Sequence, residues 1–258
     1  MNYREITLLF SAAVAGGAIN SVAGGGGFLS FPALMLTGVP SINANATSTV
    51  ALWPGTLAST GAYRKLLTAE MLKRIAPLIV ITVLGSLLGS YLLLKTRQAA
   101  FDRMVPWLLL AATLLFSLSG KIAARIVPRQ VGQKPTRLRF ALIALAQAGV
   151  AVYIGYFGAG VGIVMLALLS MMGVENIHTM NGLKTLLATF GNATAIAMFV
   201  IAHAIFWPQA MLMVVGAVLG GYGGAYFAQK LSGGAVRGLV IAIGCAMTMY
   251  FFWKTWGI

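Results

Sequence analysis

The sequence predicts an all-α fold, a polytopic membrane protein, and three observations carry this prediction. Hydrophobic residues make up 59% of the 258-residue chain, whereas roughly 45–50% is usual in a soluble domain. Charged residues make up only 9%, against about 25% in soluble domains. The apolar residues also form segments of the length that a bilayer requires, about 20 residues for a hydrocarbon core of about 30 Å. This composition excludes a soluble monomer and a disordered chain.

Eight apolar segments are long enough to be membrane helices, and two shorter ones lie between them. The long segments span residues 6–22, 43–62, 75–94, 104–118, 138–155, 176–206, 208–228 and 236–253. The shorter ones span 24–38 and 158–173, and each begins with a cluster of glycines. Each glycine disfavours a helix by about 1 kcal/mol relative to Ala, so a break is expected at each cluster. We therefore expect about eight spans and two glycine-broken short or re-entrant helices.

A basic hydrophilic segment divides the chain near its middle and separates two similar halves. We predict a first transmembrane repeat over residues 1–120, a basic linker over 121–137 and a second repeat over 138–258. A single shift of 135 residues aligns the halves without a gap over about 70 residues, as an internal repeat does. The matched pairs include Gly25 and Gly160, Gly27 and Gly162, and Gly38 and Gly173.

The number of crossings in each half decides how the two halves are related. If the glycine-led segments are re-entrant, each half crosses four times and the halves are parallel. If these segments cross, each half crosses five times and the halves are inverted. The Lys and Arg positions favour neither topology, so both stay open at this point. Internal repeats are typical of secondary transporters, whose binding site lies at the repeat interface.

The charge of the chain is strongly positive, with 18 Lys and Arg against 4 Asp and Glu. Most of the basic residues flank apolar segments, where they orient membrane helices, so we expect a lipid bilayer and no nucleic acid as partner. The linker is the strongest positive cluster, which places it in the cytoplasm. The sequence leaves open whether the chain forms a homodimer.

The reactive residues form no pattern for catalysis, metal binding or a cofactor. Cys245 is the single cysteine, which excludes an intrachain disulfide. The four acids, Glu5, Glu70, Asp102 and Glu175, fall at predicted segment ends or in loops. The sequence therefore predicts no enzyme, no cofactor and no metal site, and it disfavours cation transport through buried carboxylates.

The glycine clusters are the first candidate for ligand contact, through Gly25, Gly26 and Gly27 and through Gly160 and Gly162. Backbone N–H groups that are released from a helix can form a concavity that binds anions. Close helix packing through small residues is the alternative role. The clusters lack the Lys-Ser/Thr ending of a phosphate-binding loop, so nucleotide binding is not expected.

A polar helix start after the first short segment is the second candidate, with Asn43, Asn45, Thr47 and Ser48. Such side chains cap free amides, and a buried helix N-terminus attracts anions. The alternative role is capping together with hydrogen bonds between helices.

The equivalent segment of the second half is the third candidate, with His178, Asn181, Lys184 and Asn192. Residues 181, 184, 185, 188 and 192 share one helix face. Lys184 lies about eight residues into its helix, roughly 12 Å deep. A lysine at that depth costs about 2.5–3.5 kcal/mol unless it finds water or a partner. We expect it to face an anionic substrate in a central cavity; the alternative is a lysine that snorkels to the surface. His178 has either a proton-coupling role or a structural one.

The motifs resemble the sulfite exporter TauE/SafE family over nearly the whole chain. The run from Gly24 to Leu34, the run from Asn45 to Thr49 and the pair Tyr63-Arg64 are similar to the first signature of that family. The glycines of the second half and the run from Asn181 to Lys184 are similar to its second signature. The resemblance implies a multi-pass permease of the bacterial inner membrane that moves small anions such as sulfite or sulfonates.

These observations together predict a secondary transporter that exports a small anion (sulfite, sulfonate or a similar organic acid) by alternating access between the two repeats. An anion channel or a uniporter is the main alternative. A membrane-embedded enzyme and a structural or assembly factor are two further alternatives, which the residues favour less.

Overall fold

The computed structural model describes residues 1–23, 25–126, 136–174, 176–228 and 233–257. Within these ranges it contains ten α-helices, one short 3-10 turn and no strand. In the first half these are α1 (Tyr3–Ala23), α2 (Gly27–Leu36), α3 (Ser41–Ala62), η1 (Arg64–Leu66), α4 (Ala69–Lys95) and α5 (Gln98–Ile126). In the second half they are α6 (Arg137–Tyr156), α7 (Gly162–Met171), α8 (Ile177–Ile201), α9 (Trp207–Ala228) and α10 (Gly233–Trp256).

The two short helices are α2 and α7, each with ten residues, and each follows a glycine cluster as the sequence predicts. They begin 135 residues apart, at Gly27 and Gly162. Both end in the same way, because the next glycine, Gly38 or Gly173, adopts a positive φ of 83° or 79°. A left-handed glycine after the last turn is a frequent end of a helix, since it lets the following amides bond back to the helix carbonyls.

The outer surface of the helix bundle is apolar, as a lipid-facing surface must be. Leu84 on α4 is 60% exposed and Leu145 on α6 is 72% exposed. By length and composition alone, three of the described helices are able to cross a membrane, namely Ala69–Lys95, Arg137–Tyr156 and Ile177–Ile201. Exposed apolar faces on such helices are explained by a bilayer and not by water. The all-helical, multi-pass prediction is therefore confirmed.

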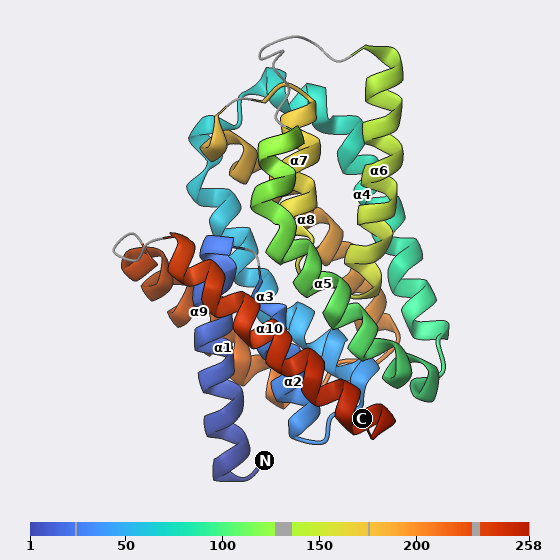
Figure 1. Cartoon of the computed structure of the whole chain (residues 1–258), viewed down its shortest axis with the longest axis vertical. Helices are drawn as coiled ribbons and strands as arrows, with labels where there is room; N and C mark the ends of the chain where they lie inside the picture. Colours follow the sequence, from blue (N-terminus) through green and yellow to red (C-terminus); the bar gives the residue numbers. More distant parts are fainter. Residues whose placement is uncertain (24, 127–135, 175, 229–232, 258) are drawn as a thin grey trace.

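Helices of the two sequence halves pack against one another instead of forming separate bundles (Figure 1). Helix α1 packs on α9, α4 packs on α6, and α3 and α8 meet at the centre. Glycines allow the two outer pairs to approach closely. A Cβ at Gly155 would collide with the backbone oxygen of Ser86, and one at Gly220 would collide with that of Val14. Small residues at helix contacts are typical of membrane bundles.

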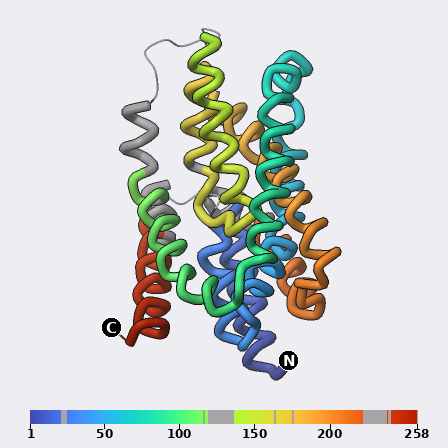
Figure 2. Tube along the Cα trace, turned by 90° about the vertical axis from the view of Figure 1, so that its right-hand side faces the viewer, coloured from blue at the N-terminus to red at the C-terminus, as the bar shows by residue number. Residues whose placement is uncertain are grey.

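Corresponding helices of the two halves run in opposite directions. Both chain ends lie at one end of the molecule, whereas α6 starts at the opposite end, here called the linker end (Figures 1 and 2). Helix α7 lies toward the linker end, where the Arg74 guanidinium donates to the Met172 carbonyl. Helix α2 lies toward the end with the chain termini, where Asn43 donates to the Ala204 carbonyl. Of the two topologies that the sequence left open, this arrangement favours the inverted one.

Candidate functional site

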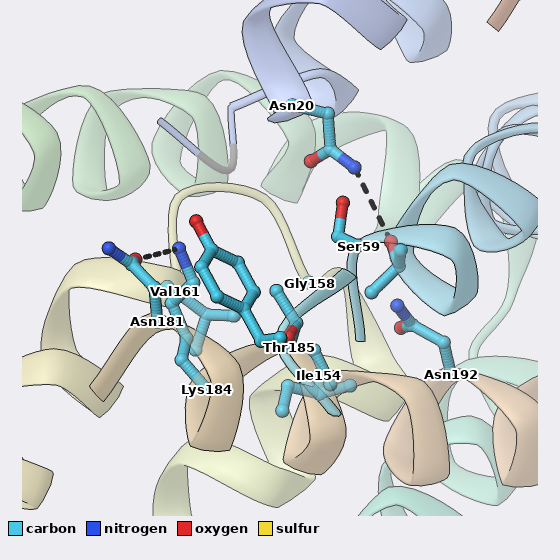
Figure 3. Close-up of a pocket in the computed structure, with 13 residues that line it drawn as sticks. Asn20, Ser59, Ile154, Gly158, Val161, Asn181, Lys184, Thr185 and Asn192 are labelled. Atoms are coloured by element: carbon cyan, nitrogen blue, oxygen red, sulfur yellow. Dashed lines mark hydrogen bonds between the residues drawn. The ribbon is translucent and has the colours of Figure 1, made fainter. Parts of the chain in front are cut away.

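A polar cavity of about 110 Å³ lies between α1, α3, the start of α7 and α8 (Figure 3). Its wall is formed by Asn20, Thr56, Ser59, Tyr63, Ile154, Gly158, Val161, Gly162, Asn181, Lys184, Thr185, Ala188 and Asn192. The volume is small beside the roughly 300–1,000 Å³ of cavities that hold drug-sized ligands. A solute of a few heavy atoms therefore matches this space better than a large one.

Lys184 is the charged residue of this wall, and it lies across the start of α7. It is the eighth residue of α8, at the depth expected from the sequence, and it is half-buried. Its Nζ donates to Asn181 Oδ1 over 3.0 Å. A Cβ built on Gly162 would lie 3.3 Å from Lys184 Cδ and 3.9 Å from its Nζ. A glycine at the first position of α7 therefore gives the lysine side chain the room to lie there.

Both groups at this contact, the lysine and the start of α7, are positive. Helix α7 begins at Gly162, and the residue before it, Val161, provides no side-chain cap. The first amides of a helix have no partner within the helix, and the macrodipole makes this end positive. Among the described residues of the wall there is no Asp or Glu to balance the lysine. Two positive groups thus face one small cavity, and an anion is the solute that would balance both.

Uncharged polar groups complete the wall. Asn20 Nδ2 donates to Thr56 Oγ1 over 3.4 Å (Figure 3). The Thr185 hydroxyl donates to the carbonyl of Gly182 in its own helix. The amide of Asn192 points toward the cavity and has no hydrogen bond to another described residue. A half-buried amide without a partner is available to a ligand or to water.

A second polar cavity, of about 70 Å³, lies beside the first at the start of α2. Its wall includes Gly27, Phe31, Asn45, Ser48, Thr49, Leu52, Phe157 and Ala159. The two cavities share Asn20, Thr56, Gly158 and Asn192. The two glycine-led stretches meet between them, since a Cβ on Gly27 would lie 3.6 Å from the Ala159 Cβ. Gly158 and Gly160 adopt positive φ angles of 74° and 75° at this junction, a conformation that other residues rarely take.

The structure brings together about half of the residues that the sequence singled out. Gly162, Asn181, Lys184 and Asn192 line the first cavity, and Gly27, Asn45, Ser48 and Asn192 line the second. Gly25, Gly26, Asn43, Thr47, Gly160 and His178 line neither cavity. Asn43 and Thr47 instead bond to the backbone of the α8–α9 loop. His178 is exposed in the first turn of α8. A role in binding stays a prediction for every one of these residues.

Sequence reasoning missed several wall residues, among them Asn20, Thr56 and Ser59. Asn20 had a signal, because it is a lone amide inside an apolar segment and four residues before the first glycine cluster. The hydroxyl residues had none, since Ser and Thr are frequent in membrane helices and bond to their own helix.

A comparison with protein families identifies the family of the chain. The family model for the sulfite exporter TauE/SafE matches residues 8–251. The chain belongs to the TauE/SafE family. The resemblance that the two glycine-led signatures indicated is thereby confirmed over nearly the whole length.

Curated relatives of this TauE/SafE protein have names that agree with the family. A probable membrane transporter protein of Haemophilus influenzae is 29% identical over 94% of this chain and 92% of its own length. The probable membrane transporter protein YfcA of Escherichia coli K12 is 28% identical over 97% of this chain and 90% of its own. ORF9 of Sinorhizobium sp, also named a probable membrane transporter protein, is 26% identical over 96% of this chain. No solved structure matches the chain at a significant level.

Proposed function

We propose that this chain is a bacterial inner-membrane transporter that exports a small anion, such as sulfite, a sulfonate or a similar organic acid, by alternating access between two repeats. Membership of the TauE/SafE family supports transport across a membrane, and the family description supports an anion as cargo. The proposal needs neither a catalytic group nor a cofactor.

One observation carries the choice of an anion. The ammonium group of Lys184 and the uncapped start of α7 face the same small cavity, and no acid stands in the described wall. A lysine at this depth costs about 2.5–3.5 kcal/mol when its charge is not balanced, and the Asn181 oxygen that Lys184 contacts is neutral. A bound anion removes that cost, because it accepts hydrogen bonds from Nζ and from the free amides of α7 at once.

The placement of charge supports export toward the end with the chain termini. Arg74 lies at the linker end, as do Arg64 and Lys65 of η1 and the basic start of α6. The positive-inside rule puts this end in the cytoplasm. An inside-negative potential then favours the exit of a monoanion by about 2.3 kcal/mol per 100 mV. No coupling ion is required for net export of such a solute.

A pair of lysine variants tests the proposal. Lys184→Met removes the charge but keeps much of the side-chain volume, whereas Lys95→Met removes an exposed lysine from the end of α4. We expect Lys184→Met to lower sulfite or sulfonate flux from proteoliposomes at least about 100-fold, since a charged hydrogen-bond partner is worth about 1.5–3 kcal/mol and the Coulomb attraction is lost as well. Lys95→Met should transport at the normal rate. Normal flux in Lys184→Met would refute an anion site at this lysine.

The kinetics of the flux separate a transporter from the alternative, an anion channel or uniporter. Alternating access predicts a saturable flux with a turnover far below that of a pore. Current through a single molecule in a planar bilayer would overturn alternating access and leave the anion as cargo. A monoanion flux that follows an imposed voltage moves net charge, as a uniporter does, and a flux that ignores the voltage requires a coupled ion.

A further inference from the structure

The two polar cavities are built from matching positions of the two halves. Helices α3 and α8 begin at Ser41 and Ile177, 136 residues apart, which is one residue more than the 135 that separate the starts of α2 and α7. The structure therefore places one extra residue before α8, and α3 and α8 correspond at a shift of 136. Five residues of α8 line the first cavity: Asn181, Lys184, Thr185, Ala188 and Asn192. The residue 136 positions before each of them lines the second cavity. Residues at equivalent positions of α3 and α8 therefore form the walls of the two cavities.

The short helices α2 and α7 also occupy equivalent positions at the two cavities. Gly27 at the start of α2 lines the second cavity, as Gly162 at the start of α7 lines the first. Neither helix has a side-chain cap at its N-terminus. Each cavity therefore faces the positive end of one ten-residue helix.

The side chains of the second cavity provide donors but no full charge. Asn45 stands where the first cavity has Asn181, and Thr49 stands where it has Thr185. Asn45 is only 4% exposed, and its Nδ2 donates to the Tyr156 carbonyl over 3.1 Å. An amide nitrogen has two N–H groups, and the second one has no acceptor among the described residues. A buried donor that lacks an acceptor indicates a ligand or a water at this place.

The one change of charge between the cavities is at Ser48, which stands where the first cavity has Lys184. Ser48 is 4% exposed, and its hydroxyl bonds to that of Ser30 over 2.6 Å. When the Ser30 hydroxyl is the donor of this bond, and not the donor to the Gly26 carbonyl, the Ser48 hydroxyl keeps its one proton for an oxyanion. The second N–H of Asn45 is a further donor, whereas the first cavity adds a full positive charge.

We propose that the second cavity is a second, weaker binding site, here called the second station, for the same small oxyanion. The anion reaches it from the first cavity, which contains Lys184 and is the first station. This inference rests on the proposed function. The shared wall residues Thr56 and Asn192 lie between the stations and contact both. The strong station lies on the α7 side, toward the linker end, and the weak one lies on the α2 side, toward the chain termini. An anion that is held tightly at first and weakly afterwards leaves readily on the second side.

An exchange of the two matched residues tests the second station. Sulfite is the probe, and its binding to the purified full chain is measured by calorimetry. Lys184→Ser should weaken binding at least about tenfold, the lower limit for a lost charged hydrogen bond. The double variant Lys184→Ser/Ser48→Lys should recover most of the affinity, because the new lysine lies beside the start of α2 as Lys184 lies beside α7. A folded double variant that binds no better than Lys184→Ser would overturn the second station.

A smaller change keeps the test decisive if a lysine at position 48 prevents folding. Ser48→Ala removes one hydroxyl, and Ser90→Ala is its matched control, a buried α4 hydroxyl that bonds to its own helix. We expect Ser48→Ala to keep sulfite binding at Lys184 but to transport about tenfold more slowly, the loss of about one hydrogen bond to the passing anion. Equal transport by the two alanine variants would refute the second station. Undiminished sulfite binding by Lys184→Ser would instead refute the anion site at Lys184, on which the choice of an anion in the proposed function depends.

Discussion

Helices α3 and α8 both begin with a run of polar residues, but the two runs use their hydrogen-bonding groups differently. In α3, Asn43 donates to the Ala204 carbonyl over 2.9 Å, and the Thr47 hydroxyl accepts from the Phe206 amide over 3.1 Å. These bonds fasten the α8–α9 loop to the first half of the chain. Asn43 and Thr47 of the α3 run therefore serve to hold the two halves together.

In α8 the polar groups have fewer protein partners. The Asn181 side chain bonds to Lys184, and the side-chain amide of Asn192 bonds to no described residue. Both line the first cavity. Residue types alone do not distinguish the two runs; the difference is whether a backbone group of another helix or loop lies within reach. Groups that bond to protein contribute to stability, and groups without partners are available to a ligand.

The largest effect that this comparison predicts is on transport, in the variant Asn192→Leu. Leucine has a similar size but offers no hydrogen bond to an anion at the wall between the two cavities. We expect the flux to fall at least about 100-fold, since passing an unpaired anion costs more than about 2.7 kcal/mol. The melting temperature should stay the same or rise, because the amide has no described partner to lose. Flux measured in proteoliposomes together with thermal unfolding in detergent checks both statements.

Asn192→Ser is the companion variant, because a hydroxyl keeps one donor and should retain part of the flux. A leucine variant that transports normally would show that the anion does not pass Asn192. The unpaired polar groups of α8 would then have no demonstrated role in transport.

An intermediate effect is expected on stability, in the variant Thr47→Val. Valine keeps the shape of threonine but leaves the Phe206 amide without its acceptor, which costs about 1–3 kcal/mol. The melting temperature in detergent should fall by several degrees. Thr194→Val is the matched control, since the Thr194 hydroxyl bonds only to a carbonyl of its own helix. If Thr47→Val kept its melting temperature but lost transport, Thr47 would belong with the α8 residues.

The division into eight long and two short helices could be predicted from the sequence, because hydrophobic length and glycine clusters are local signals. The ends of the helices were harder to predict from the sequence. Helix α4 begins at Ala69, six residues before its apolar segment, because Thr68 caps it and accepts from the Met71 amide. Helix α5 likewise runs on to Ile126, beyond its apolar segment. Charged turns at the membrane surface continue a helix without adding to its hydropathy.

The candidate site could be predicted only in part, for a physical reason. Lys184 could be predicted as a site residue, because a charge deep in an apolar helix has few explanations. Whether Asn43 or Asn45 faces a ligand depends on which backbone group lies opposite, and that is a property of packing between segments more than 100 residues apart. No local pattern contains this information.

The smallest effect is expected on anion affinity, in the variant Gly162→Ala, which adds one methyl group at the start of α7. The new Cβ would lie 3.3 Å from Lys184 Cδ, so the flexible lysine must shift by a few tenths of an ångström. We expect anion affinity to fall a few-fold, less than about 1 kcal/mol, while the helix gains up to about 1 kcal/mol from the loss of a glycine. Gly149→Ala in α6 is the control, since nothing lies within 4 Å of its added Cβ. It should raise the melting temperature and leave affinity unchanged. If both variants bound the anion as tightly as the parent chain, the room that Gly162 leaves for the Lys184 side chain at the start of α7 would not matter for binding.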